Sequence, residues 1–279
     1  MNHMFIRPAA VAVSLAAALC LVWAAGAAAV DPFAALRRGL DPKDGVLLAD
    51  ESGKTLFSHN GDTPLIPAST LKIFTALVGL HYLGPEYRFV TEIYTDENRN
   101  LKIKGCGDPL FISEVIADLA RHVAAKVDRY RDLALDNSYF SVNEIPGVTA
   151  TLIPYDAPNG ALCANFNTVY FRWSNGRLVS AEPQTPLLDF AAWRIKARRS
   201  KGGRIILSQE ADEATLYAGH LIRHFLKNAG VEGGATIRIG RADPKTDRLV
   251  LRHVSPYTLT DVLSKLLAHS NNFIANQVR

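Results

Sequence analysis

Apolar and polar positions alternate first with the period of β-strands and then with that of a helix. Two short alternating runs flank a polar turn in which Gly53 can take a positive φ angle, and they predict a β-hairpin from residues 45–50, 51–54 and 55–59. An apolar run at helical spacing then continues to Gly84 and Pro85, which are typical of a helix end. One stripe of this helix predicts a buried face: Leu71, Phe74, Leu77 and Val78.

The start of this helix carries the first candidate site. Ser69 and Lys72 stand three residues apart, so one helical turn places both side chains on the same face. A serine hydroxyl is a weak nucleophile at neutral pH and needs an adjacent base, and a lysine amine is such a base when burial lowers its pKa. Ser-x-x-Lys is also expected about once by chance in a chain of this size. The position at a helix start, where the dipole disfavours a positive charge, favours the catalytic interpretation.

The rest of the chain mixes strands and helices and predicts an α+β fold. Strands are predicted at residues 88–95, 101–104, 133–135, 167–173, 177–180, 235–239 and 248–253. Helices are predicted at residues 111–127, 215–229 and 258–268, and a further one begins at residue 273. Residues 192–207 are strand-prone and basic, which favours a solvated face over a surface for anionic polymers.

Composition and the N-terminal segment narrow the class of protein. The net charge of +4 is too small to indicate nucleic-acid binding. Residues 1–29 have a positive start, an Ala-rich apolar run and a small-residue finish, which predicts a cleaved secretory signal in preference to a membrane anchor. No later run is long enough to span a bilayer.

Export gives meaning to the two cysteines that follow the leader. In an oxidising compartment Cys106 and Cys163 could form a disulfide, and a pair of buried free thiols is an equal alternative. No cluster of His, Cys and Asp shows metal-ligand spacing, so we predict no metal, and no motif indicates a cofactor.

A second polar constellation lies far along the chain, between two predicted helices. It contains Ser270 and Asn272, and a corner between helices can direct such side chains into a cleft. There Ser270 could relay a proton to a leaving amine, while Asn272 could hold a substrate carbonyl and keep Lys72 neutral. Ser-x-Asn also occurs at residues 58–60 and 141–143, and most such triplets cap helices or close turns.

Taken in order, these features resemble the low-molecular-mass penicillin-binding proteins that act as D-alanyl-D-alanine carboxypeptidases and endopeptidases, in the branch with a large insert after the nucleophile. The matching pieces are residues 48–50 with Gly53, 67–72, 105–109, 136–140, 155–162 with Asn165 and Asn167, and 264–276. The resemblance implies a transpeptidase-like domain in two parts, residues 30–87 and 246–279, with a strand-rich insert domain at residues 88–245.

The resemblance also implies roles for the four site residues. Ser69 would attack the carbonyl between two D-alanines of a peptidoglycan stem peptide in the periplasm, with Lys72 as general base. Ser270 would support proton transfer, and Asn272 would bind substrate. β-Lactams would be inhibitors that acylate Ser69. A serine β-lactamase and a non-catalytic peptidoglycan-binding or vestigial protein are the alternatives.

The sequence departs from the family pattern at its third motif. The family carries Lys-Thr-Gly on the strand that edges the active site, and this triplet is absent from the sequence. The strands expected with it are missing as well. We therefore expect a C-terminally truncated chain with an incomplete transpeptidase-like domain, an uncovered apolar face on the Ser69 helix, and impaired catalysis.

Overall fold

A computed structural model describes residues 31–140 and 151–278 and divides the chain into two compact units, residues 1–67 and 68–279. The predicted signal at residues 1–29 and the triplet at residues 141–143 lie outside the described residues. Among the described helices, none combines the length and apolar character needed to cross a membrane. Helices alternate with several separate sheets, which confirms the α+β prediction.

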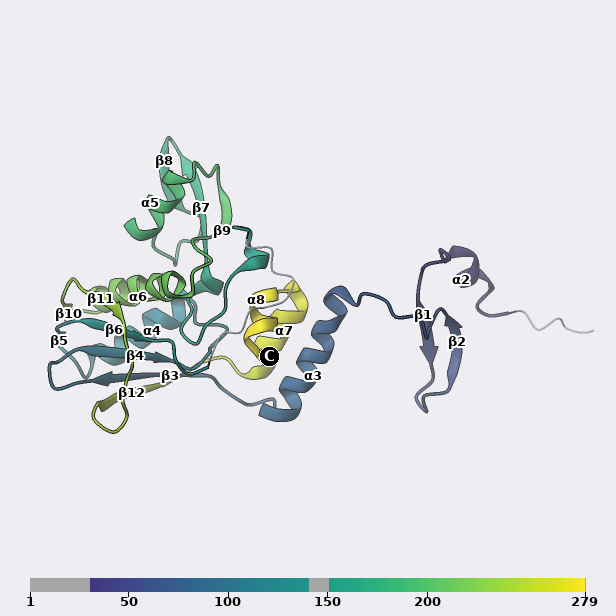
Figure 1. Ribbon diagram of the computed structural model, residues 1–279, viewed down its shortest axis with the longest axis horizontal. Coiled ribbons are helices and arrows are strands. Elements are labelled where there is room, and N and C mark those ends of the chain that lie inside the picture. The colour runs from purple at the N-terminus through teal and green to yellow at the C-terminus, as the bar shows by residue number, and fades with distance from the viewer. Residues whose placement is uncertain (1–30, 141–150, 279) are drawn as a thin grey trace, which may run out of the picture. The chain divides into compact units, whose positions relative to one another are not determined.

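The first unit contains a helix and a hairpin (Figure 1). Helix α2 spans Ala34–Gly39, and the antiparallel strands are β1 (Val46–Ala49) and β2 (Thr55–His59). Gly53 has a φ of 84° in the connecting turn, and the Asp50 carboxylate accepts two backbone N–H groups of that turn. The hairpin is therefore formed where the alternating pattern predicts it.

The second unit is built on a five-stranded mixed sheet. Its strands are β3 (Val90–Thr95), β4 (Leu101–Gly105), β6 (Leu133–Asp136), β11 (Ile237–Ile239) and β12 (Arg248–Val254). They lie in the order β11-β6-β4-β3-β12; β3 pairs antiparallel with both β4 and β12, and β6 pairs parallel with β4 and β11. A parallel two-residue pair, β5 (Arg129–Tyr130) and β10 (Glu232–Gly233), lies apart from it.

The two faces of this sheet differ in chemistry. Helices α4 (Ser113–Ala124) and α6 (Ala211–Asn228) pack against each other, and they contact the sheet through β12 and through β6 and β11 respectively. Alternate strand residues such as Ile93 and Ile103 are fully buried in the core that these helices share. The strand residues that alternate with these buried ones, such as Lys102, point to the other face of the sheet. There the Lys102 amine lies 2.9 Å from the Asp247 carboxylate. Burial on one face and ion pairs on the other fix the register of the strands.

A smaller three-stranded sheet corrects one prediction. Its order is β8-β7-β9, from β7 (Thr168–Ser174), β8 (Arg177–Ser180) and β9 (Gly203–Ile206), and it is accompanied by helix α5 (Asp189–Ala197). Residues 192–207 were predicted as strand, and most of that prediction is wrong. Ala191 and Ile195 lie one turn apart and are buried, so they give α5 an apolar face. The only strand of this segment, β9, begins at Gly203.

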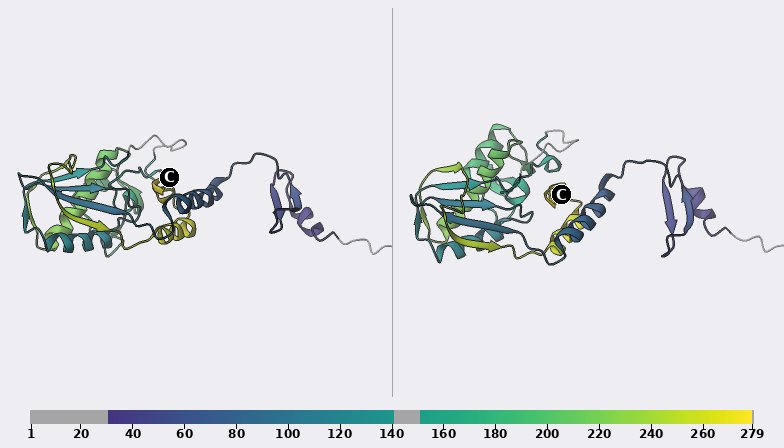
Figure 2. Two further views of the ribbon diagram at one scale, coloured as in Figure 1. Left: turned by 90° about the horizontal axis from the view of Figure 1, so that it is seen from below. Right: turned by 60° about the horizontal axis from the view of Figure 1, so that its bottom comes forward.

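The third part of this unit is a cluster of three helices (Figure 2): α3 (Leu71–Leu83), α7 (Leu259–His269) and α8 (Asn272–Val278). Helix α3 contacts the other two through a face that includes Ala76 and Gly79. A Cβ atom at Gly79 would lie 3.1 Å from Cγ1 of Val278, so glycine permits the close approach of α3 and α8. Small residues thus form the packed face of α3.

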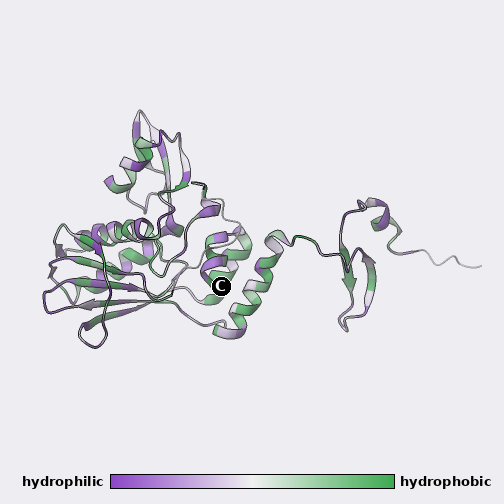
Figure 3. Cartoon of the chain, in the orientation of Figure 1, coloured by the Kyte–Doolittle hydropathy of each residue, from purple (hydrophilic) through white to green (hydrophobic). Residues whose placement is uncertain are grey.

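The large apolar residues of α3 point the other way. Leu71, Phe74, Leu77 and Val78, which the helical spacing predicted to be buried, are exposed among the described residues, and this prediction is wrong. The ribbon of α3 is mostly green in Figure 3, which marks hydrophobic residues. The periodicity identified the helix, but its larger apolar stripe is not the face that packs. That α3 lost its cover through truncation stays a prediction.

The predicted domain boundaries at residues 87 and 245 stay a prediction. The structure divides the chain at residue 67, and the five-stranded sheet includes a strand from beyond residue 245, because β12 pairs with β3. Strand β12 follows the predicted insert domain in the sequence, but it therefore belongs to the same sheet as the strands of that insert.

Cys106 and Cys163 are both buried free thiols. Burial raises the pKa of the Cys106 thiol to about 11 and that of the Cys163 thiol to about 12. The Cys163 Sγ atom lies 3.2 Å from the carbonyl oxygen of Gly160 and acts as a weak donor. Of the two alternatives left open by the sequence, the structure shows the free thiols.

Asp108, in the turn after β4, gives a prediction on stability and pH. Its carboxylate accepts the Leu110 N–H at 2.8 Å, and burial raises the pKa of this carboxyl to about 6. A folded pKa above the unfolded value near 3.9 means that the group favours folding most at low pH, and that this contribution is lost as pH rises through 6. Asp108→Asn keeps the acceptor and should stabilise the protein by about 2–3 kcal/mol at pH 8, with little gain at pH 4. Urea unfolding at both pH values tests this, and destabilisation at pH 8 would contradict it.

Candidate active site

The nucleophile candidate lies where the chain enters α3. Ser69 is the middle residue of a short 3-10 turn, Ala68–Thr70, and Lys72 is the second residue of the α-helix that follows. Ala68 has a φ of 45°, in the left-handed region that residues with a Cβ atom rarely adopt. The Ser69 side chain is exposed, whereas Lys72 is 8 % exposed. A reachable hydroxyl is thus placed beside a buried amine.

The second half of the site comes from the corner between α7 and α8. A capping box formed by Thr258 and Asp261 starts α7. The helix ends at Ser270, which has a φ of 49° and donates its N–H to the Leu266 carbonyl. This left-handed residue turns the chain so that Asn272 begins α8. A strained backbone held at a polar residue is common at functional sites.

The two halves meet at the Lys72 amine. Its Nζ atom lies 3.2 Å from Ser69 Oγ, 3.2 Å from Ser270 Oγ and 2.6 Å from Asn272 Oδ1. The Ser270 hydroxyl donates to Ser69 Oγ at 2.7 Å. The structure therefore brings together all four residues that the sequence singled out.

These contacts use the full donor capacity of the Lys72 side chain. A lysine ammonium has three N–H donors. Lys72 Nζ donates to Ser69, Ser270 and Asn272, and the Ser270 hydroxyl in turn donates to Ser69. Desolvation lowers the pKa of Lys72, and no carboxylate forms a salt bridge with it in residues 31–140 and 151–278. A lowered lysine pKa and a short distance to a serine hydroxyl are the properties that a general base for that hydroxyl needs.

Helix α8 is held in place by the segment at residues 157–167. The Asn159 amide donates to the Phe273 carbonyl at 3.0 Å and to the Gln277 side-chain oxygen at 2.7 Å, and all of these groups are buried. The Gln277 amide donates to the Gly160 carbonyl at 2.7 Å. The ring of Phe166 packs edge-on against that of Phe273, with centroids 5.9 Å apart. Asn159 lies within one of the segments that resemble the family, but nothing local in the sequence indicates its contact with α8.

Asn159 therefore gives a prediction on positioning. Asn159→Ala removes two buried hydrogen bonds from α8 and should cost about 1–3 kcal/mol of stability. Because α8 begins with Asn272, reagents that acylate Ser69 should also react more slowly with this variant. Thermal unfolding and labelling rates measure the two effects, with the exposed Asn98→Ala as the matched control. Unchanged stability in Asn159→Ala would contradict this role.

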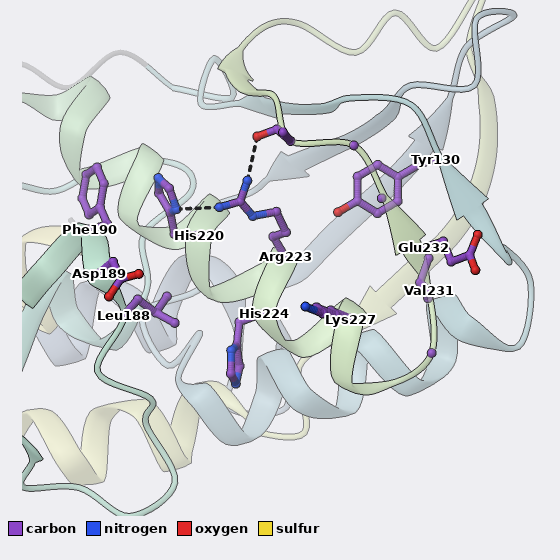
Figure 4. A pocket seen from close by; sticks show the side chains of 14 residues that line it. Tyr130, Leu188, Asp189, Phe190, His220, Arg223, His224, Lys227, Val231 and Glu232 are labelled. Carbon is purple, nitrogen blue, oxygen red and sulfur yellow. Dashed lines mark hydrogen bonds between the residues drawn. The ribbon is translucent and has the colours of Figure 1, made fainter.

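Two pockets lie outside the cluster of four residues. One, of about 480 Å³, is lined partly by His269, Asn271 and Phe273, which flank the corner between α7 and α8. The other, of about 930 Å³, lies along α6 (Figure 4). Ser69 and Lys72 line neither pocket.

The larger pocket has mixed charges. Arg223 donates to the Ala235 carbonyl at 2.7 Å and lies 3.3 Å from His220 Nδ1, as Figure 4 shows. Burial and the neighbouring arginines lower the pKa of His220 to about 4, so the ring is neutral at pH 7. Lys227 adds a cation to the lining, but Asp189 and Glu232 line the same pocket, so its charge does not select an anion or a cation.

Comparison with known proteins places the chain in a family of enzymes. A profile of the D-Ala-D-Ala carboxypeptidase 3 (S13) family matches residues 42–202, and the chain belongs to this family. It is similar to the D-alanyl-D-alanine carboxypeptidase of Actinomadura sp. (strain R39), with 35 % identity over 106 residues, which cover 34 % of this chain and 20 % of that protein. It is also similar to the D-alanyl-D-alanine carboxypeptidase DacB of Haemophilus influenzae, with 23 % identity over 270 residues, which cover 79 % of this chain and 54 % of DacB.

The fold agrees with this membership. The crystal structure of penicillin binding protein 4 (dacB) from Haemophilus influenzae matches with a TM-score of 0.60 and 22 % identity, over 81 % of this chain and 59 % of that chain. The family resemblance and the fold class inferred from the sequence are therefore confirmed. This chain spans little more than half the length of DacB.

Proposed function

We propose that this chain carries the reactive centre of a serine-type D-alanyl-D-alanine carboxypeptidase or endopeptidase that acts on peptidoglycan stem peptides in the periplasm. The observation that carries the proposal is the closed set of hydrogen bonds joining Ser69, Lys72, Ser270 and Asn272. Family membership supports the same reaction class, and the names of both curated relatives state this activity for those proteins.

The proposed reaction proceeds by acyl transfer. Ser69 Oγ attacks the carbonyl carbon between the two D-alanines while the Lys72 amine takes the hydroxyl proton. The C–N bond then breaks, and the departing amine receives a proton from Lys72 through the Ser270 hydroxyl. Water attacks the resulting ester and frees Ser69. The Asn272 amide, which accepts from Lys72, holds the amine in position and offers its N–H₂ group to the substrate.

The proposal is tested by covalent trapping with a β-lactam. A crystal structure of the Haemophilus relative is described as a complex with a β-lactam, which supports the choice of probe. Incubation with a labelled penicillin, digestion and mass spectrometry should place one adduct on the peptide that contains Ser69. An adduct on any other peptide would contradict the assignment of the nucleophile.

A second candidate is a non-catalytic peptidoglycan-binding protein. Sedimentation with purified cell wall but no covalent label would support this candidate. A label that is released within seconds would instead indicate a β-lactamase.

A further inference from the structure

We infer that helix α4 and strand β12 form a binding site for a divalent transition-metal ion of the zinc type, outside the cluster around Ser69. The site consists of Asp118, His122 and His253, each of which offers one ligand atom, and these atoms lie within 4.8 Å of one another. The sequence predicted no metal because His253 is far from the other two along the chain. Only the packing of α4 against β12 brings them together.

The ligand set has the chemistry of a zinc-type site. Asp118 and His122 are four residues apart on α4, so they share one helix face, and the His122 Nδ1 atom lies 3.3 Å from a carboxylate oxygen of Asp118. Two imidazoles and one carboxylate form a three-ligand set for Zn²⁺ or a similar ion, with a fourth position open to water. His122 is exposed and Asp118 is half-buried, so an ion can reach the site from solvent.

The strongest indication is an unpartnered histidine. His253 is 6 % exposed, and its buried Nε2 atom has no hydrogen-bond partner among the described residues. Leaving such a group unpaired is unfavourable, because it has lost its hydrogen bonds to water without gaining a partner. The ring lies beside that of His122, with centroids 6.1 Å apart. A buried imidazole kept beside two further ligand side chains is explained by an ion that all three bind.

Binding requires small movements and must compete with one ion pair. Ligands about 2.0–2.2 Å from a tetrahedral ion lie about 3.4 Å apart, which is closer than the outer limit of 4.8 Å seen for this cluster. The exposed His122 side chain has the freedom to close the gap. Arg121 donates to the other carboxylate oxygen of Asp118 at 2.7 Å and therefore competes weakly with a cation. An ion at this site would link α4 to the edge strand of the five-stranded sheet.

Titration of the chain with ZnCl₂ in chelator-free buffer, followed by calorimetry, tests this inference. The wild-type chain should bind one Zn²⁺ at this site, with an increase in melting temperature that EDTA reverses. His122→Ala and Asp118→Asn should each weaken binding at least tenfold. Arg121→Ala should bind as tightly as the wild-type chain or more tightly, because it frees the carboxylate.

The matched control is His81→Ala, which removes an exposed helical histidine elsewhere and should leave binding unchanged. His122 is exposed, so its replacement by alanine should not unfold the protein, and circular dichroism verifies this. Absence of Zn²⁺ binding in the wild-type chain would overturn the inference. Equal binding by the wild-type chain and His122→Ala would overturn it as well, since the ion would then be held by other residues.

Discussion

Replacing Ser69 by alanine should abolish covalent labelling by penicillin. The variant retains Lys72 and Ser270, so it removes only the atom that the proposed reaction acylates. Loss of a catalytic nucleophile removes the covalent route altogether. Gel fluorescence after incubation with a labelled penicillin measures the effect, and circular dichroism verifies folding.

The matched control for this prediction is Ser270→Ala. The Ser270 hydroxyl lies 2.7 Å from that of Ser69, so either serine could in principle be labelled. If Ser69 is the nucleophile, Ser270→Ala should still be labelled, about 10–100-fold more slowly, because one hydrogen bond to the developing charge is lost. Labelling that survives in Ser69→Ala and disappears in Ser270→Ala would reverse the two roles.

Replacing Lys72 by alanine should slow labelling by about 10²–10⁴-fold, the usual contribution of a general base. The amine contacts Ser69, Ser270 and Asn272 together, so its loss also leaves the Asn272 oxygen without this donor. Lys72→Arg separates charge from basicity, since a guanidinium keeps the positive charge and does not deprotonate in proteins. Labelling of the Lys72→Arg variant should therefore be as slow as labelling of Lys72→Ala.

The pH dependence of labelling gives an independent measure of the same role. Desolvation lowers the pKa of Lys72, so the neutral, basic form becomes populated below the ordinary lysine value near 10.4. The labelling rate of the wild-type chain should therefore rise with pH and level off below that value. In Lys72→Arg the rise should be absent. A rate that is independent of pH in the wild-type chain, or full activity in Lys72→Arg, would exclude Lys72 as the base.

The four site residues could be predicted because each half of the site is a local motif. Ser69 and Lys72 share one turn of helix, and Ser270 and Asn272 flank one helix corner, so neighbours in sequence determine each half. That the halves meet was a hypothesis from the sequence, and the family resemblance supported it. In the structure, the contact depends on α3 packing against α7 and α8 through small residues such as Gly79.

Features that depend on distant residues were missed. The apolar stripe of α3 identified a helix but not which face packs, because the packed face contains Ala76 and Gly79, whose small side chains carry little hydrophobic signal. In α5, the burial of Ala191 and Ile195 on one helix face outweighs the strand propensity that begins at residue 192. Asn159 and His253 form their significant contacts with elements far along the chain. No local pattern could have indicated these contacts.

The pairing of β3 with β12 has a consequence for how the reactive centre assembles during folding. Lys72 and Ser270 are separated by 198 positions, and closing so long a loop of disordered chain carries a large entropic cost. Val90 and Val254 are partners at the end of the sheet from which the chain leads to α3 on one side and to α7 on the other. Once this pair has formed, only two short connections remain flexible. We therefore expect the sheet to form before the contact between Lys72 and Ser270, so that Ser270 and Asn272 join the Ser69–Lys72 pair late in folding.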